Sequence, residues 1–570
     1  MAESSNTTLY GDDKLKSDPE AEREHVTLHR VESVSERVDS RLALSSRPSA
    51  HQLDSSISQQ VFYAFHHEHH QHSKDGGADD KEEPSHTNTS CEKEIQSSTE
   101  SAEIIYVDWE PNDPRNPATY SNTRKWVITV TACAMTGLSA AVASTYPIGY
   151  GSMTADLNCT TFQATIGLSL YTLGFGLIPL VTAPFSEEFG RQPLYVVSGF
   201  IFMIMHLGVA LAQNIQSVQI MRFIQGGAGS TGATMVGGTI ADIWSPEQRG
   251  LPMSVFAIGA IGGLGLGPTL AGWIETNKNL QWRWIQYIHL IVGFVLFLAI
   301  ITFMKETRGS VLLTKIAKKM RKDTGDPKYR ARIEDERGSL KSLMLVSLTR
   351  PIYFLFAEPV VTSFSLWIGF AWGVLFVFLE SISPAFTQLH QFNIGEIGSI
   401  YGCISIGSVL GFASHYFIQE RLYRNQYKRR KQEARLYSAC AAGILFPISM
   451  FIYAWTSFSH VTWIAMAIGI VLFVWAAFVM YLAVFSYLAD CYGPFASSAL
   501  AGQSLCRNLA GTAFPLFTTQ MYAKLTFKWA GTLFGGIAFL MMPIPFILFF
   551  RGPRIRAKSK FASQVPTFSS

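Results

Sequence analysis

The stretch AIGAIGGLGLGPTLAGW (residues 257–273) contains no charged residue and places a small side chain at every fourth position. These small residues are Gly259, Gly263, Gly267 and Ala271. Residues four apart lie along one stripe of a helix, and a stripe of small residues lets two helices touch within a membrane. Pro268 removes one helical hydrogen bond and bends the rod. We therefore predict a membrane-spanning helix that acts as a hinge and as a dry seal between two halves of the protein.

Apolar runs of similar length recur on both sides of this stretch. A helix crosses a bilayer with roughly 20 apolar residues. About twelve such runs are expected, at residues 126–148, 163–185, 193–213, 218–241, 252–275, 284–304, 360–382, 396–418, 436–456, 462–486, 498–521 and 529–550. Of the 570 residues 48% are hydrophobic and only 15% are charged, against about 25% charged in soluble proteins. The sequence thus predicts an all-α membrane protein rather than a cytosolic enzyme.

Positive charge is distributed unevenly between the two sides of these spans. The polar stretch at residues 305–350 divides the spans into six and six and holds thirteen Lys and Arg, whereas residues 420–435 hold seven. Such residues mark cytoplasmic loops, so both termini and the central stretch are expected in the cytoplasm. Two six-helix halves joined by a charged cytoplasmic loop are typical of transporters with a substrate cavity between the halves. A seven-span receptor and a channel with a re-entrant pore segment do not fit this organisation.

The expected organisation has six parts. They are a disordered cytoplasmic tail (1–105), a pre-membrane segment (106–125), an N-terminal six-helix bundle (126–304), a cytoplasmic central loop (305–350), a C-terminal six-helix bundle (351–550) and a cytoplasmic tail (551–570). The first tail is rich in Ser, His, Glu and Asp and poor in apolar periodicity, which is typical of disorder.

Two further patterns concern modification and metals. Asn158 begins an Asn-Cys-Thr triplet in the first outer loop, so we predict that it accepts a glycan, although such triplets also arise by chance. The seven cysteines are scattered, and the membrane part has no clustered His/Cys set. Neither a disulfide framework nor a zinc site is indicated there, and no cofactor is expected. The histidine-rich run at residues 65–72 of the tail is interpreted as a solvated low-complexity tract, with weak binding of a transition metal as the alternative.

Charged residues gather where two spans end on the cytoplasmic side. The turn APFSEEFGRQP (residues 183–193) contains Glu187, Gly190 and Arg191. Glu187 and Arg191 can pair with each other or with a facing helix end, and such a contact can form in one access state and break in the other. An ordinary positive-inside loop has the same charges. The fourth span ends at Asp242, which Arg249 follows closely enough to pair.

Three ionisable residues interrupt the apolar spans. Arg222 lies within about one turn of the outer end of the fourth span, where it either snorkels to the interface or biases the protonation of a nearby group. Arg507 and Asn508 interrupt the eleventh span, and Glu380 is the natural acidic counterpart of Arg507. A carboxyl group among apolar residues can exchange protons near neutral pH if it faces a cavity. Glu380 is therefore the acid to test first, unless it is a hydrated interfacial acid.

Together these motifs resemble the major facilitator superfamily, specifically the fungal twelve-helix drug:proton antiporter family, over about residues 105–550. Residues 183–193 are similar to the family's loop motif between spans two and three, although Ala183 and Gln192 depart from it. Arg222, Gln225 and Gly226 match the RxxQG element that the family links to proton coupling.

The part of the resemblance that concerns the direction of transport lies mostly in the fifth span. Its matching residues are Gly263, Gly267, Pro268 and Gly272, with Ala271 in place of one glycine. In the family this antiporter motif separates exporters from uptake relatives. The resemblance implies the major facilitator fold, with twelve transmembrane helices in two six-helix bundles, and plasma-membrane export of drugs, polyamines or secreted metabolites.

The roles that follow are expectations. Proton coupling is expected of Arg222, Glu380 and Arg507, and the substrate cavity is expected to include Tyr146, Gln225 and Asn508. The expected partners are a small-molecule substrate, protons and the lipid bilayer, with no nucleic acid, and the protein is expected to be a monomer. Proton-coupled uptake of a nutrient or metal chelate, and a non-transporting membrane sensor, remain alternatives. A membrane enzyme does not fit, because no span pairs a nucleophile with a positioned base.

Overall fold

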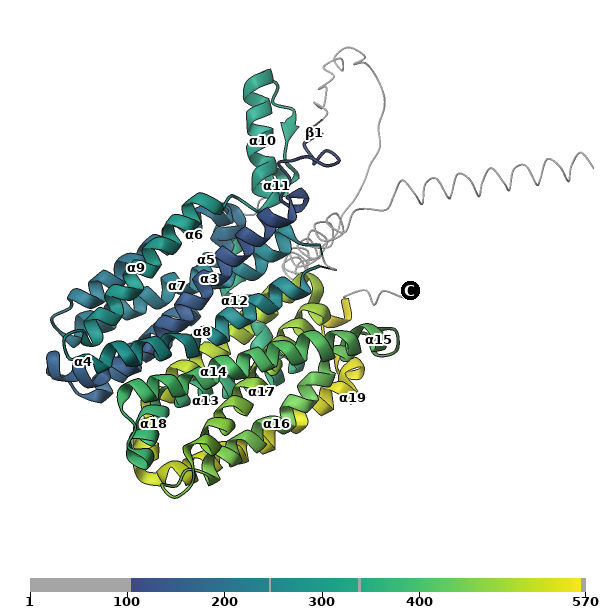
Figure 1. Cartoon of the computed structure of the whole chain (residues 1–570). Coiled ribbons are helices and arrows are strands. Elements are labelled where there is room, and N and C mark those ends of the chain that lie inside the picture. Colours follow the sequence, from purple (N-terminus) through teal and green to yellow (C-terminus); the bar gives the residue numbers. More distant parts are fainter. Residues whose placement is uncertain (1–103, 246–247, 337–339, 565–570) are drawn as a thin grey trace, which may run out of the picture. The chain divides into compact units, whose positions relative to one another are not determined.

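The computed structural model describes residues 104–245, 248–336 and 340–564, which belong to one compact unit (Ser90–Ser570). This part of the chain is helical almost throughout (Figure 1). The tail expected at 1–105 lies outside the described residues except for its last two positions, and so does the end of the chain from 565 to 570.

The first half of the chain forms one helical bundle. Its helices are α3 (Asn122–Thr145), α4 (Tyr150–Asp156), α5 (Thr161–Glu188), α6 (Arg191–Leu211), α7 (Ile215–Ile243), α8 (Gly250–Thr276) and α9 (Gln281–Phe303). A 3₁₀ turn, η2 (Tyr146–Gly149), joins α3 to α4. Helix α7 packs on α5, α6 and α3, and α8 packs on α3, so the helices of this half enclose a common core.

The second half forms another bundle. Its helices are α13 (Pro359–His390), α14 (Ile394–Ser414), α15 (Glu420–Arg430), α16 (Leu436–Trp455), α17 (Trp463–Tyr492), α18 (Ala496–Met541) and α19 (Pro543–Ala557). Helix α18 is broken at Thr526, whose φ of 63° is not helical. Helix α13 packs on α18, and α16 packs on α17 and α18.

The number of crossings fits the expected twelve. Within the described residues nine helical runs are long and apolar enough to span a membrane. Two of these runs, Ile394–Trp455 and Ala496–Ala557, are 62 residues long, which is enough for two crossings each. Helix α7 adds another crossing of 29 residues, and its many Gly and Thr residues make it less apolar than the others. The all-α membrane fold is therefore confirmed, and the helices fit the expected two bundles of six.

The two bundles meet mainly along two helix pairs. Helix α8 of the first half packs against α14 of the second, and α5 packs against α18. In the sequence, the segment 305–350 connects the two bundles. It contains α10 (Gly309–Thr324), β2 (Tyr329–Arg330), α11 (Arg332–Glu336) and most of α12 (Leu340–Ala357). Strand β1 (Ile105–Tyr106) pairs in parallel with β2, which ties the pre-membrane segment to this central segment.

Candidate functional site

Arg222 is fully buried inside the first bundle. Its Nη1 donates hydrogen bonds to the carbonyl of Val142 (3.3 Å) and to Oε1 of Gln225 (2.8 Å). Its guanidinium lies between the rings of Tyr146 and Tyr171, at 4.2 and 4.3 Å from their centroids. Because the residue is 0% exposed, it does not snorkel to the interface. The two aromatic faces instead compensate part of the desolvation of the cation.

The contacts of Arg222 continue into a buried polar network from three helices. Nε2 of Gln225 lies 3.0 Å from Nδ1 of His206, and Oε1 of Gln286 lies 3.1 Å from the same atom. The rings of His206 and His289 are 5.5 Å apart. Gln286 also lines a small cavity together with Tyr146, so the network reaches from Arg222 to this cavity. Gln225, expected in the substrate cavity, is instead fully buried within the network.

Glu380 makes a contact between the two bundles. The hydroxyl of Tyr150, on α4, donates a hydrogen bond of 2.8 Å to Oε1 of Glu380 on α13. The hydroxyl of Thr165, on α5, lies 3.4 Å from Oε2. Glu380 is only 9% exposed, so it is not a hydrated interfacial acid. No local pattern in the sequence indicates a role for Tyr150, because the hydrogen bond joins residues 230 positions apart and only the packing of the halves brings them together.

Arg507 does not pair with Glu380, contrary to the sequence-based expectation. Among the described residues its guanidinium lies over the rings of Trp372 (4.5 Å) and Tyr481 (5.1 Å), and no ion pair joins it to an acid. The reason is position along the helices. Trp372 and Glu380 are eight residues apart on α13, which corresponds to about 12 Å of helix rise. Asn508 is also buried, and its Cβ would lie only 2.9 Å from a Cβ on Gly176 of the other bundle.

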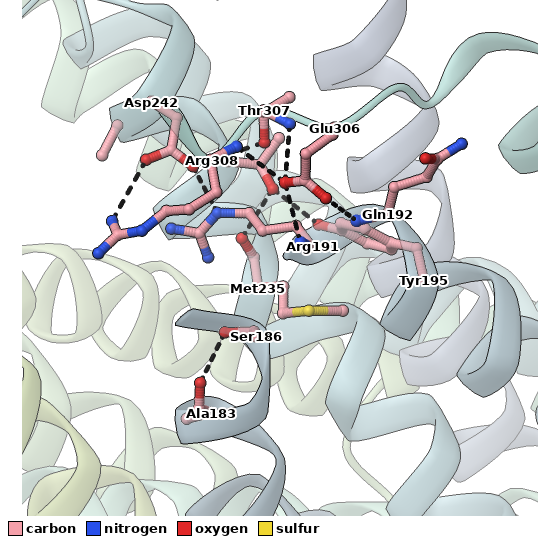
Figure 2. Close-up of polar contacts among 12 residues, drawn as sticks. Ala183, Ser186, Arg191, Gln192, Tyr195, Met235, Asp242, Glu306, Thr307 and Arg308 are labelled. Carbon is pink, nitrogen blue, oxygen red and sulfur yellow. Dashed lines mark hydrogen bonds and ion pairs between the residues drawn. The ribbon is translucent and has the colours of Figure 1, made fainter. Parts of the chain in front are cut away.

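A charged cluster lies at the end of the first bundle where α6 begins and α7 ends (Figure 2). Nε of Arg191 is paired with Asp242, and Nη1 of Arg308 lies 3.7 Å from the same carboxylate. Gly238 leaves room for the guanidinium of Arg191, because a Cβ at that position would collide with it. Arg191 therefore joins the start of α6 to the end of α7.

Glu306 completes this cluster by binding backbone rather than a cation. Its carboxylate accepts hydrogen bonds from the amides of Arg191, Gln192, Thr307 and Arg308, at 2.8–3.2 Å. Two of these amides form the N-terminus of α6, where a negative charge is favourable. Gly190 has φ 98°, and a Cβ on it would collide with this carboxylate, so glycine is required there. The contact of Glu306 with the start of α6 could not be predicted from the sequence, because Glu306 follows Gly190 by 116 residues.

Two other residues expected in this cluster have different neighbours. Glu187 is exposed, and the ion pair of Arg191 is with Asp242. Arg249 donates hydrogen bonds to the carbonyl of Ala241 in the last turn of α7 (2.7 Å) and to that of Trp244, the C-cap residue of the helix (2.9 Å). A cation at that position complements the helix C-terminus.

The glycine stripe of α8 seals a different contact from the one expected. A Cβ on Gly263 would lie 2.5 Å from the carbonyl of Gly137, and a Cβ on Gly267 would lie 2.8 Å from Cα of Ala141. Both neighbours belong to α3, so this stripe packs within the first bundle. The expectation of a seal between the halves is corrected here, because four-residue spacing defines a face but not its neighbour.

The contact between the halves uses another face of α8. A Cβ on Gly265 would lie 2.7 Å from the carbonyl of Tyr401, and a Cβ on Gly272 would lie 2.8 Å from Cα of Gly398. Both neighbours belong to α14 of the second bundle. Pro268 lies within α8 between these two glycines, and its carbonyl would be 2.7 Å from a Cβ on Gly398. Of the expected motif, Gly272 thus lies at the contact between the halves.

Asn158 lies in the short turn between α4 and α5, and its side chain is exposed. The next threonine, Thr160, caps α5 by accepting a hydrogen bond from the amide of Gln163 at 3.2 Å. Glycosylation of Asn158 stays a prediction.

Comparisons with known proteins agree with this architecture. The family model described as Major Facilitator Superfamily matches residues 129–494. The chain is 34% identical over 468 residues to the multidrug transporter mdrA of Aspergillus fumigatus, covering 81% of this chain and 76% of that protein. It is 32% identical over 470 residues to fluconazole resistance protein 1 of Saccharomyces cerevisiae, covering 80% and 85%. The human organic anion transporter MFSD10 has a similar fold, with TM-score 0.54 and 15% identity over 75% of this chain and 100% of that chain.

Proposed function

Because the chain belongs to the Major Facilitator Superfamily, in its fungal drug-efflux branch, we propose that it is a proton-coupled antiporter that exports small organic compounds. Its multi-pass membrane architecture is that of a transporter of small compounds. Drugs, polyamines and secreted metabolites are the proposed substrate classes. The relatives named for multidrug transport and fluconazole resistance support export over uptake.

The observation that carries this proposal is the hydrogen bond between Tyr150 and Glu380. It joins the two bundles at one end, and it buries a carboxyl group to 9% exposure. A neutral carboxyl is buried more readily than a carboxylate, so a proton taken up when this end is open favours its closure. The network around Arg222 lies on the same side of the first bundle, since the ring of Tyr146 contacts both the guanidinium of Arg222 and, edge to face, the ring of Tyr150.

Proton and substrate are coupled only if they have different affinities for the two access states. In this scheme the proton favours closure at the Glu380 end, and the substrate favours the opposite arrangement. The cluster of Arg191, Asp242 and Glu306 lies at the other end of the first bundle and holds three of its helix ends together. This division assigns gating to the ion pair of Arg191 and Asp242, a structural role to Glu306, and proton coupling to Glu380.

The charge distribution supports a sidedness for the cycle. The thirteen Lys and Arg of residues 305–350 favour the cytoplasm for the end that carries Arg191 and Asp242. Both termini would then be cytoplasmic, and Glu380 would face protons outside the plasma membrane. Protease protection of terminal tags in sealed cells tests this orientation, and a tag cleaved from outside contradicts it.

The central test is transport into inside-out plasma-membrane vesicles with an acidic interior. Labelled fluconazole and spermidine serve as probes. We expect at least one probe to accumulate when the interior is acidic, and we expect Glu380→Gln to remove the dependence on the pH gradient. Glu396→Gln is the matched control, because Glu396 is an exposed acid near α13 whose helix-capping role a glutamine also fulfils. Accumulation that ignores the gradient contradicts antiport.

A further inference from the structure

Arg507 is a cation in an aromatic cradle, and none of the described residues pairs it with an acid. The rings of Trp372 and Tyr481 are 5.9 Å apart, and the guanidinium lies over both. Its Nη2 lies 3.4 Å from the hydroxyl of Ser504, while Nε has no hydrogen-bond partner among the described residues. A guanidinium within a membrane protein is costly unless a negative or polar group compensates it. This site therefore has an unfilled capacity to bind an anion.

The cradle lies on the stripe of α13 that also carries Glu380. Trp372, Phe376 and Glu380, spaced four residues apart, are 8%, 5% and 9% exposed. Val374 and Leu379, on other faces of the same helix, are 0% exposed. Since Glu380 at one end of this stripe contacts Tyr150 of the other bundle, the stripe faces the space between the bundles.

Neighbouring residues of Arg507 also face the other bundle. Thr512 lies 3.1 Å from Thr172 of α5, hydroxyl to hydroxyl, and Asn508 packs against Gly176 of the same helix. Arg507 itself is 9% exposed, so it is more than nine-tenths buried. It thus lies beside the contact between the bundles, about 12 Å of helix rise from Glu380.

We propose that Arg507, Trp372 and Tyr481 form the binding site for an organic anion, a substrate that carries a carboxylate next to a flat aromatic group. The guanidinium donates to the carboxylate, because its planar donors match that geometry. The rings of Trp372 and Tyr481 contact the flat part of the substrate. The inference rests on the proposed transport function and gives Arg507 substrate recognition in place of the proton coupling expected from the sequence.

The test compares two probes that differ only in charge, N-dansylglycine and its amide, with purified full-length protein. Dansyl fluorescence gives the Kd of each probe. We expect wild-type protein to bind the carboxylate at least about tenfold more tightly than the amide, as a charge-assisted hydrogen bond provides. Arg507→Gln should remove this preference by weakening only the carboxylate, and Arg507→Lys should retain part of it. Equal binding of both probes by wild type, or binding of neither, overturns the proposal.

A matched control separates this role from a general loss of charge. Arg124 also stacks on an aromatic ring, that of Tyr120 at 3.6 Å, but it lies at the start of α3. Arg124→Gln should keep the carboxylate preference, and an equal loss in both variants contradicts a specific site. Thermal unfolding of each variant tests whether it is folded. If Arg507→Gln does not fold, Arg507→Lys, which keeps the positive charge, is the second variant in which the carboxylate preference is measured.

Transport of the same probes distinguishes the two proposals from each other. If wild-type protein binds the carboxylate selectively but moves neither these probes nor fluconazole or spermidine in response to a pH gradient, the anion site stands and the antiporter is rejected. If gradient-driven transport is seen and Arg507→Gln slows both probes equally, the antiporter stands and the anion site is rejected.

Discussion

Two buried glutamates of this protein are held in opposite ways. Glu306 accepts hydrogen bonds from four backbone amides of the first half of the chain. Glu380 belongs to the second bundle and is held by hydroxyl groups of the first. The first arrangement persists as long as its bundle is folded, whereas the second disappears whenever the bundles separate. A buried acid is therefore structural or switchable according to which bundle supplies its partners.

The glycines of α8 show the same contrast. Gly263 and Gly267 make room for α3 of their own bundle, and Gly265 and Gly272 make room for α14 of the other. One helix thus carries a fixed face and a face that must open and close. Substitutions on the face toward α3 should reduce the amount of folded protein. Substitutions on the face toward α14 should instead prevent the movement of the two bundles.

The largest effect is expected for Glu306→Ala. Four backbone amides lose a shared carboxylate in a position that is 5% exposed, so we expect a loss of about 3–5 kcal/mol in the free energy of unfolding. Thermal unfolding in detergent and the yield of folded protein measure this loss. Glu110→Ala removes an exposed acid of the same chain and should unfold like wild type. Wild-type stability of Glu306→Ala would show that the carboxylate is not structural.

A smaller effect is expected for leucine on either face of α8. Each added side chain meets backbone atoms closer than 3.0 Å, and overpacking of this kind costs about 1–3 kcal/mol. Gly267→Leu should lower the unfolding temperature of the protein. Gly265→Leu should leave both bundles folded and abolish transport, because it prevents α8 and α14 from closing. If both variants unfold at the same temperature with the same residual transport, the distinction between the two faces is wrong.

The sequence predicts the spans and the buried charges better than it predicts their partners. Apolar length locates the helices, and a charged residue inside an apolar run identifies Arg222, Glu380 and Arg507. The pairing of Arg507 with Glu380 was wrong, because sequence order does not give their levels along α18 and α13. The stripe that contains Gly267 was expected between the two halves, but it packs on α3 of its own bundle. The reason is related: periodicity shows which residues share a face but does not identify the helix that they contact. Tyr150 and Glu306 act through contacts over more than 100 residues and have no local signature.

Tyr150→Phe removes one hydrogen bond between the bundles and keeps the ring. We expect it to destabilise the closed state relative to the open state by about 1 kcal/mol. The population closed at the Glu380 end should fall about fivefold relative to the open one. Spin labels at Gly151 on α4 and Gln388 on α13, both exposed, measure the distance between the bundles at this end. An unchanged distance distribution would mean that this hydrogen bond does not hold the bundles together.

The smallest effect is expected for Thr165→Val. The hydroxyl of Thr165 is 3.4 Å from Glu380, against 2.8 Å for Tyr150, and hydrogen bonds between oxygen atoms weaken beyond about 3.0 Å. We therefore expect the free-energy difference between the closed and open states to change by less than about 0.5 kcal/mol. The ratio of closed to open populations, measured with the same labels, should then stay within about twofold of wild type. Valine keeps the shape of threonine, so the comparison isolates the hydroxyl. A larger effect than that of Tyr150→Phe would make α5, and not α4, the helix that holds Glu380 across the two bundles.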